Sequence, residues 1–222
     1  MEKDYSKYEN YWNSCFAESS CSGAVKESLG CSELEAGLKW LCEGSRSVLD
    51  FGCGCGTLLF FCSRFGTQKH TGIDFSKEAI RDAEKRAKAF SEKQYSFYQG
   101  STELLKKIPA ESMDAVILSN ILDNLYPEDS QSALRECHRI LRMGGKILIK
   151  LNPYFSADEL KEEQAAVVEN NLVDDGLLLW NLPTKEWDRM LGQYFVIHSL
   201  EDAHFQQYDG AVNRLYRAVK EK

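Results

Sequence analysis

One short segment constrains the fold of this chain more than any other: the run VLDFGCGCGT at positions 48–57. Aliphatic residues lead into an acid and then into three glycines that alternate with small residues. This order predicts a buried parallel strand that ends in a tight turn and opens a helix. Glycine permits a positive φ and leaves no Cβ between the backbone and a ligand, so the turn is typical of a ligand site at a helix N-terminus. The alternative is a strand-to-helix turn that binds nothing.

A second acid follows about one strand–helix–strand unit later. The run HTGIDFS at positions 70–76 predicts a short strand that ends in Asp74. At this distance from Asp50, a carboxylate can accept hydrogen bonds from both hydroxyls of a ribose. A nicotinamide dehydrogenase and a nucleoside-binding methyltransferase both fit so far. The glycines are spaced G-x-G-x-G, and no Arg or Lys lies in or beside the loop to meet a diphosphate, which favours the methyltransferase.

Strands and helices are predicted to alternate along the chain. The expected strands are 47–51, 69–74, 95–99, 113–119 and 146–151, and the expected helices are 56–65, 76–92 and 128–142. Gly144 and Gly145 would supply the left-handed stop of the last helix. A helix at 184–192 and two strands, about 194–200 and 213–220, complete the pattern. This rhythm predicts an α/β fold with a doubly wound sheet, whose ligands bind beyond the carboxyl ends of the strands.

The chain resembles the class I S-adenosylmethionine-dependent methyltransferases, most closely the small-molecule group that includes the quinone-biosynthesis methyltransferases. Five segments in the family's order carry the resemblance, over roughly residues 40 to 152: VLDFGCGCGT (48–57), TGIDFSKEAI (71–80), FYQGSTELL (97–105), SMDAVILSNILDNL (112–125) and RECHRILRMGGKILI (135–149). The resemblance implies a mostly parallel seven-stranded sheet with an antiparallel last strand, an N-terminal helical lid, and methyl transfer by direct displacement.

The resemblance also implies which residues contact S-adenosylmethionine. Asp50 would orient the glycine loop and reach the amino-acid end of the cofactor. Asp74 would accept hydrogen bonds from the ribose hydroxyls, and Phe75 would lie against the adenine. The backbone beside the methionyl and ribose parts would come from Gly52, Cys53, Gly54 and Gly56.

Two further cofactor contacts are implied after the third and fourth strands. Ser101 and Thr102 stand where many relatives carry Gly-Asp, so adenine N6 would meet a hydroxyl or a backbone acceptor there. Asn120, at the end of the fourth strand, would face the sulfonium near the methyl group.

The N-terminal segment carries aromatic residues at helical spacing, namely Tyr5, Tyr8, Tyr11 and Trp12. They indicate a helix that packs on the core, covers the cofactor, or does both. Aromatic faces attract a sulfonium cation by about 0.5–2 kcal/mol. We expect Tyr11 to contact the cofactor and Trp12 to contact the methyl acceptor.

Four segments are therefore expected: a helical cap (1–45), a cofactor-binding core (46–152), an insertion (153–182), and a C-terminal helix and strands that complete the sheet (183–222). The insertion is predicted to hold an acidic helix at 158–170, and either covers the acceptor or only pads the surface. Beside Trp12, candidate acceptor contacts are Asp123, Tyr126 and Trp180.

No catalytic residue is assigned. Transfer from a sulfonium requires alignment and exclusion of water, and a base only if the acceptor arrives protonated. Candidates for such a base are Asp123, Tyr126, His198 and His204.

Composition and charge lead to predictions about partners and location. The net charge is −7 and the isoelectric point about 5.3, whereas a nucleic-acid modifier usually shows a basic face. We therefore expect a small-molecule acceptor and no nucleic-acid partner. The sequence contains no run of about eighteen apolar residues, so no membrane span is predicted. The N-terminus lacks the pattern of a secretion signal, and eight cysteines without a C-x-x-C pair indicate reduced thiols, no metal site and a cytoplasmic location.

Two other functions stay open. The acidic insertion could recruit a protein or peptide as methyl acceptor. The chain could also be a non-catalytic regulatory protein that binds S-adenosylmethionine.

Overall fold

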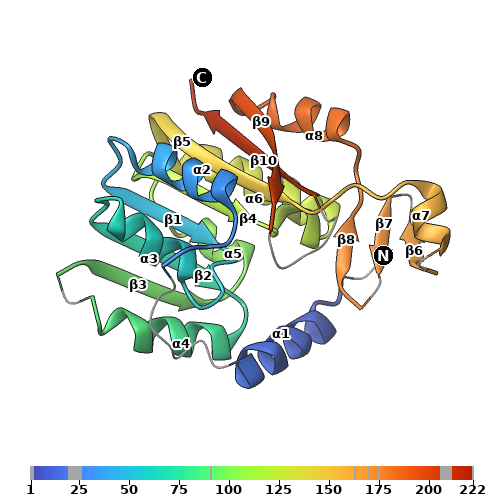
Figure 1. The fold of residues 1–222 in the computed structure, drawn as a ribbon, viewed down its shortest axis with the longest axis horizontal. Coiled ribbons are helices and arrows are strands. Elements are labelled where there is room, and N and C mark those ends of the chain that lie inside the picture. The colour runs from blue at the N-terminus through green and yellow to red at the C-terminus, as the bar shows by residue number, and fades with distance from the viewer. Residues whose placement is uncertain are drawn as a thin grey trace.

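A seven-stranded sheet runs through the protein in the order β3-β2-β1-β4-β5-β10-β9 (Figure 1). The computed structural model describes residues 3–19, 27–90, 92–162, 164–169, 171–174, 176–205 and 212–221; Cys21 lies outside them. The strands are β1 (Ser47–Phe51), β2 (Lys69–Asp74), β3 (Gln94–Gln99), β4 (Met113–Ser119), β5 (Leu141–Leu151), β9 (Val196–His204) and β10 (Val212–Val219). The first five pair in parallel, and β10 is antiparallel to both of its neighbours. The predicted fold class is confirmed.

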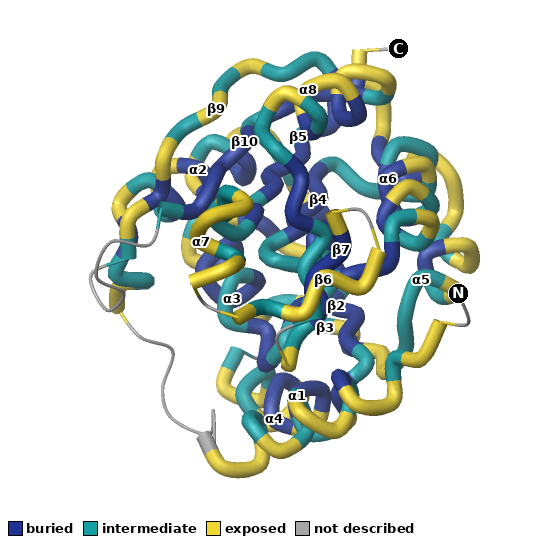
Figure 2. Tube along the Cα trace, turned by 90° about the vertical axis from the view of Figure 1, so that its right-hand side faces the viewer, coloured by how far each residue is buried: buried dark blue, intermediate teal, exposed yellow. Residues whose placement is uncertain are grey.

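Helices cover both faces of this sheet. One face is covered by α2 (Ser32–Cys42), α3 (Thr57–Arg64) and α4 (Lys77–Ala87). The other face is covered by α5 (Thr102–Leu105), α6 (Pro127–Ile140) and α8 (Thr184–Leu191). In Figure 2 the central strand β4 is largely buried, and exposed residues lie on the outer helices and loops.

Alternate residues of the central strands supply the two cores. In β4, Ala115 and Ile117 pack toward α2, α3 and α4, whereas Val116 and Leu118 pack toward α5, α6 and α8. Side chains of a strand point to opposite faces with a period of two. A strand covered on both faces therefore has an unbroken apolar run, as at 115–118.

A small antiparallel meander stands beside the main sheet. It consists of β6 (Ala166–Glu169), β7 (Leu172–Asp174) and β8 (Leu178–Trp180), and α7 (Ala157–Glu162) precedes it. Helix α1 (Ser6–Ser19) runs next to α4 (Figure 1). These elements come from the first and third predicted segments.

Three of the predicted helices differ from the structure. The helix predicted at 76–92 ends at Ala87. The predicted helix 158–170 is wrong in its second half, because α7 ends at Glu162 and residues 166–169 form β6. Two consecutive valines, which favour strands, account for the change. The predicted helix 128–142 ends at Ile140, and Gly144 and Gly145 lie within β5. The register of β5 against β4 shifts there, so these glycines serve an irregular strand rather than a helix stop.

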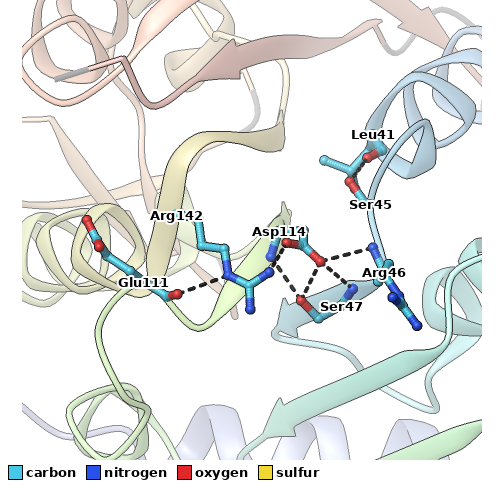
Figure 3. A network of polar contacts seen from close by, with 7 residues as sticks. All are labelled: Leu41, Ser45, Arg46, Ser47, Glu111, Asp114 and Arg142. Carbon is cyan, nitrogen blue, oxygen red and sulfur yellow. Dashed lines mark hydrogen bonds and ion pairs between the residues drawn. The ribbon is translucent and has the colours of Figure 1, made fainter.

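Asp114 joins the starts of β1 and β4, at the edge of the sheet where these strands begin (Figure 3). Its Oδ2 accepts hydrogen bonds from Arg46 N at 3.0 Å and from Ser47 N and Oγ, both at 2.9 Å. Its Oδ1 accepts from Arg142 Nη1 at 2.6 Å. Burial acts to raise the pKa of Asp114, but these hydrogen bonds and the charge of Arg142 outweigh it and hold the pKa below its usual value. The network therefore fixes the relative position of two central strands.

We expect Asp114→Ala to lower the free energy of unfolding by about 2–4 kcal/mol at pH 7, because several backbone and side-chain donors lose a charged acceptor. A depressed pKa stabilises the fold above the unfolded value of 3.8, so the difference from wild type should shrink as the pH falls below about 4. Urea denaturation of wild type and variant from pH 3 to 8 measures this difference in the free energy of unfolding. Asp202→Ala, which removes an exposed carboxylate on β9, is the control; equal effects of the two substitutions would contradict the role of the network.

Candidate functional site

A cavity of about 280 Å³ lies where the carboxyl ends of β1, β2, β3, β4 and β5 meet. The chain order of the strands reverses between β1 and β4, and ligands of doubly wound sheets bind at such a switch point. The cavity walls come from the loops after these strands, from α1 and from the turn before β8. The lining residues are Tyr5, Tyr8, Trp12, Phe16, Phe51, Gly52, Gly54, Asp74, Phe75, Gly100, Ser101, Ser119, Asn120, Ile121, Asn124, Leu125, Asn152, Leu177 and Leu178.

The glycine loop forms the floor of this cavity. Gly52 and Gly54 have φ values of +79° and +50°, which favour glycine. A Cβ on Gly52 would lie 3.0 Å from Ile121, and one on Gly54 would lie 3.1 Å from the ring of Phe16. The loop is tied to β2, because Gly52 N donates to Ile73 O at 2.8 Å. The backbone conformation therefore requires glycine where the loop meets the cavity, and a Cβ there would also be tightly packed.

Asp74 lines the cavity at the end of β2. Its Oδ2 accepts from Gly54 N at 2.8 Å, and its Oδ1 accepts from Ser76 N at 2.9 Å. Burial raises the pKa of Asp74, and these two backbone hydrogen bonds act against the rise. A carboxylate has about four acceptor positions, so positions remain for a ligand. The side chain is thus oriented by backbone donors and keeps acceptor positions for a ligand in the cavity.

Asp50 lies below the loop, outside the cavity lining. Its side chain is buried, with 1% of the residue exposed, and neither carboxyl oxygen has a hydrogen-bond partner among the described residues. Burial first, and the charge of Asp74 second, raise the pKa of Asp50 to about 8. The group is therefore largely protonated at neutral pH.

One face of α1 and the residue just before it close the cavity with aromatic rings. Tyr5, Tyr8, Trp12 and Phe16 line it, at intervals of three and four residues that place them on one side of a helix. Tyr11 falls off this face and is 45% exposed. Phe16 continues the interval of the predicted aromatic residues, although it was not among the predicted site residues.

Polar contacts hold this aromatic face in place. Tyr5 Oη donates to Asp129 Oδ2 of α6 at 2.8 Å, and Tyr8 Oη donates to Asp174 Oδ2 of β7 at 3.1 Å. Lys7 also pairs with Asp174. Helix α1 therefore bridges α6 and the meander over the cavity.

Asparagines form the wall beyond β4 and β5. Asn120 has a φ of +51°, a left-handed conformation that Asn tolerates better than most residues. Its Nδ2 donates to Asn152 Oδ1 at 3.1 Å, and Asn152 Nδ2 donates to Asn124 Oδ1 at 3.1 Å. Asn124 and Asn152 were not among the predicted site residues, because only contacts between residues distant in sequence bring them beside Asn120.

The structure brings part of the predicted site together. The predicted residues that line the cavity are Trp12, Gly52, Gly54, Asp74, Phe75, Ser101 and Asn120. The predicted residues outside its lining are Tyr11, Asp50, Cys53, Gly56, Thr102, Asp123, Tyr126 and Trp180.

The candidate bases also lie outside the cavity lining. Tyr126 and Trp180 line a neighbouring cavity of about 280 Å³. Asp123 is buried behind Asn152, whose N donates to Asp123 Oδ2 at 2.6 Å, and burial raises the pKa of Asp123 to about 6. His198 and His204 lie on β9 and face Glu221 and Glu33 respectively.

Within the described ranges, no helix is both long and apolar enough to cross a bilayer. The same part of the chain holds no group of three or more His, Cys, Asp or Glu placed to bind a metal ion.

We expect Asp50→Asn to stabilise the protein increasingly as the pH rises. Folded Asp50 keeps its proton up to about pH 8, whereas the unfolded residue loses it near pH 3.8. The folded state therefore binds more protons between these values, and the wild-type free energy of unfolding falls as the pH rises through this window. The amide of the variant cannot ionise, so the free energy of unfolding of the variant does not fall in this way as the pH rises. Chemical denaturation at pH 5, 6, 7 and 8 measures the difference, and a constant difference would contradict the assignment. Asp158→Asn, which changes an exposed carboxyl on α7, is the control.

Comparisons with known proteins show similarity in the segment that forms much of this cavity. Residues 48–145 match the family model described as a methyltransferase domain. A tRNA N(3)-methylcytidine methyltransferase of Schizosaccharomyces pombe is 25% identical over 162 residues, which are 69% of this chain and 52% of that protein. A ribosomal protein L11 methyltransferase of Chromobacterium violaceum is 32% identical over 126 residues, 55% of this chain and 39% of that protein. The chain spans about half or less of the length of these relatives.

A solved structure shows the same fold. The 1,6-didemethyltoxoflavin-N1-methyltransferase of Burkholderia thailandensis, crystallised with 1,6-didemethyltoxoflavin and S-adenosylhomocysteine, has a TM-score of 0.70 at 16% identity. The match covers 100% of this chain and 92% of that one.

The relatives contradict the predicted partners. A small-molecule acceptor without nucleic acid was expected from the net charge of −7, but the S. pombe relative is a tRNA methyltransferase. Net charge is an average over the whole surface, and it does not report what one cavity accepts. The family, by contrast, agrees with the resemblance seen in the sequence. Residues 48–145 match a methyltransferase domain, and this agrees with the predicted S-adenosylmethionine-dependent enzyme class and its cofactor.

Proposed function

We propose that this protein transfers a methyl group from S-adenosylmethionine to a base of a transfer RNA. The observation that carries the proposal is the match to a tRNA N(3)-methylcytidine methyltransferase over 69% of the chain. The match extends beyond residues 48–145 of the domain model, because it spans 162 residues. The narrower likeness to quinone-biosynthesis enzymes forms no part of this proposal.

The cavity has the character that a nucleobase needs. Tyr5, Tyr8 and Trp12 present aromatic surface on one side, and asparagine amides stand on another. Proteins that bind single-stranded or flipped-out bases stack them on aromatic rings and read their edges with hydrogen bonds. A planar base fits such walls better than a flexible aliphatic acceptor.

The chemistry of a cytosine acceptor suits the residues present. S-adenosylmethionine, when bound, supplies a methyl group already activated by its sulfonium. The N3 atom of a neutral cytosine carries a lone pair and no proton, so methylation there requires no general base. The protein must align the base and exclude water, and orientation alone can contribute about 7–11 kcal/mol. The absence of an assigned base among the cavity residues is consistent with this step.

Roles within the site follow the sequence-based assignments and form part of the proposal. Asp74 holds the ribose of the cofactor and Phe75 lies against its adenine. Asn120 stands near the methyl group. Residues 1–45 and 153–182 cover the cofactor and the acceptor, and the protein acts in the cytoplasm.

A methyl-transfer assay tests the acceptor. We expect tritium from labelled S-adenosylmethionine to enter total tRNA, to resist protease and to be released by ribonuclease. After digestion, the labelled nucleoside should co-elute with 3-methylcytidine in liquid chromatography and have the same mass. Asp74→Ala is the matched negative control. Label in no RNA fraction would contradict the proposal.

A second candidate acceptor is a protein. The relative that methylates ribosomal protein L11 is 32% identical, and a net charge of −7 attracts basic proteins. The same assay with ribosomal proteins distinguishes it, because the label would then resist ribonuclease and be released by protease.

Asp74→Ala should weaken S-adenosylmethionine binding at least tenfold. Hydrogen bonds to a charged acceptor contribute about 1.5–3 kcal/mol each, and two ribose hydroxyls would lose theirs. Isothermal titration calorimetry on the folded variant measures the change. Asp82→Ala removes another buried carboxylate, on α4 and paired with Lys85, and should leave the affinity unchanged. A change of less than threefold for Asp74→Ala would exclude the ribose contact.

A further inference from the structure

Three asparagine side chains form a directed chain of hydrogen bonds along the wall of the cavity. Asn120 Nδ2 donates to Asn152 Oδ1 at 3.1 Å, and Asn152 Nδ2 donates to Asn124 Oδ1 at 3.1 Å. Asn124 Nδ2 then donates to Leu178 O at 2.6 Å. This chain of hydrogen bonds thus begins just after β4, passes through Asn152 just after β5 and ends on the backbone of β8.

The last link sets the direction of the others. A backbone carbonyl can only accept, so Asn124 must turn its NH₂ toward Leu178 and its oxygen toward Asn152. Asn152 must then present its NH₂ to Asn124 and its oxygen to Asn120. Asn120 in turn points its NH₂ at Asn152. Each amide orientation therefore follows from a group whose role cannot reverse.

This arrangement leaves one acceptor without a partner. Asn120 Oδ1 is buried and has no hydrogen-bond partner among the described residues, although Asn120 lines the cavity. An unpaired buried carbonyl is costly and calls for an explanation. The backbone of Asn120 is also in the left-handed region, with its N donating to Lys150 O at 2.8 Å. Unfavoured conformations of this kind concentrate at ligand sites.

We propose that Asn120 Oδ1 accepts a hydrogen bond from the amino group of the methyl acceptor, and that Asn152 and Asn124 are positioning residues that keep this oxygen available. The inference rests on the proposed function and names the edge of the base that the site reads. An acceptor with an N–H donor beside the methylated atom satisfies the oxygen. Cytosine has this pattern, with its amino group next to N3, whereas a keto group at that position would oppose oxygen to oxygen.

The contact also favours the reaction. When N3 of cytosine takes the methyl group, the sulfonium becomes a neutral thioether and the base gains a positive charge. That charge spreads onto the amino group, so its hydrogen bond to Asn120 strengthens as the carbon–nitrogen bond forms. Interactions that are stronger in the transition state raise kcat. Loss of the orientation should therefore lower kcat more than it raises KM.

The orientation itself is tested by NMR, independently of any acceptor. The side-chain amide signals of Asn120 are identified by their loss in Asn120→Asp. We expect Asn152→Ala to shift these signals, because Asn120 Nδ2 loses its acceptor. The backbone contacts of Asn152 with Asp123 and Arg214 do not need its side chain. Asn213→Ala is the matched control, since it removes a buried asparagine on β10 that donates to Leu151 O beside Asn152. Unshifted Asn120 signals in Asn152→Ala would overturn the proposal that Asn152 orients the side chain of Asn120.

The role in recognition is tested with two RNAs. One carries the target cytidine, and the other carries at that position the analogue that lacks the amino group, pyrimidin-2-one ribonucleoside. We expect the wild-type preference for cytidine, as a ratio of kcat/KM, to fall at least fivefold in Asn152→Ala and to be unchanged in Asn213→Ala. The comparison between variants cancels the different intrinsic reactivity of the two bases. If Asn152→Ala does not fold, Asn124→Ala is the second variant. It removes the hydrogen bond to Leu178 O that sets the direction of the other amides, and it should change the preference in the same direction.

The outcomes separate the inference from the proposed function. RNA methylation with an unchanged preference would overturn the role of Asn120 while leaving the proposed function intact. If wild type methylates no RNA, the proposed function fails, and the substrate named here fails with it, whatever the amide signals show. Shifted signals together with a reduced preference support the whole inference.

Discussion

The parallel pairing of β1 with both β2 and β4 is the constraint on which the rest of the structure depends. β1 lies between the strand that ends in Asp74 and the strand that ends before Asn120. The carboxyl ends of the three strands therefore face one cavity. The Asp114 network secures β1 and β4 at their opposite ends, so the site is held from a distance by groups that never reach a ligand.

The cavity also depends on segments that are remote in sequence and outside the main sheet. Helix α1 closes it with an aromatic face, and the meander anchors both α1, through Asp174, and the asparagine chain, through Leu178 O. These contacts link the cofactor side of the cavity to the side assigned to the acceptor. In the proposed reaction such walls would exclude water and limit the orientations of a base, which is most of what displacement at a sulfonium requires.

The wrong prediction of the methyl acceptor shows how much the net charge of a protein can indicate about its substrate. A net charge of −7 predicts weak attraction to phosphate groups in general, and that physical statement still holds. It does not determine the acceptor, because a base is recognised by a few aromatic and amide groups inside one cavity. The proposed tRNA substrate would therefore be selected by its base edge more than by the field around the protein.

The sequence by itself determined the strand–turn–helix of the glycine loop, the order of the central strands along the chain and the position of Asp74. These features are local, since glycine, apolar runs and capping residues act within a few positions. Only the tertiary structure decided that Asp50 is buried with no hydrogen-bond partner among the described residues, and that Asn152 and Asn124 orient Asn120. Such facts depend on burial and on contacts between residues as far apart as Asn124 and Leu178, which no local pattern records.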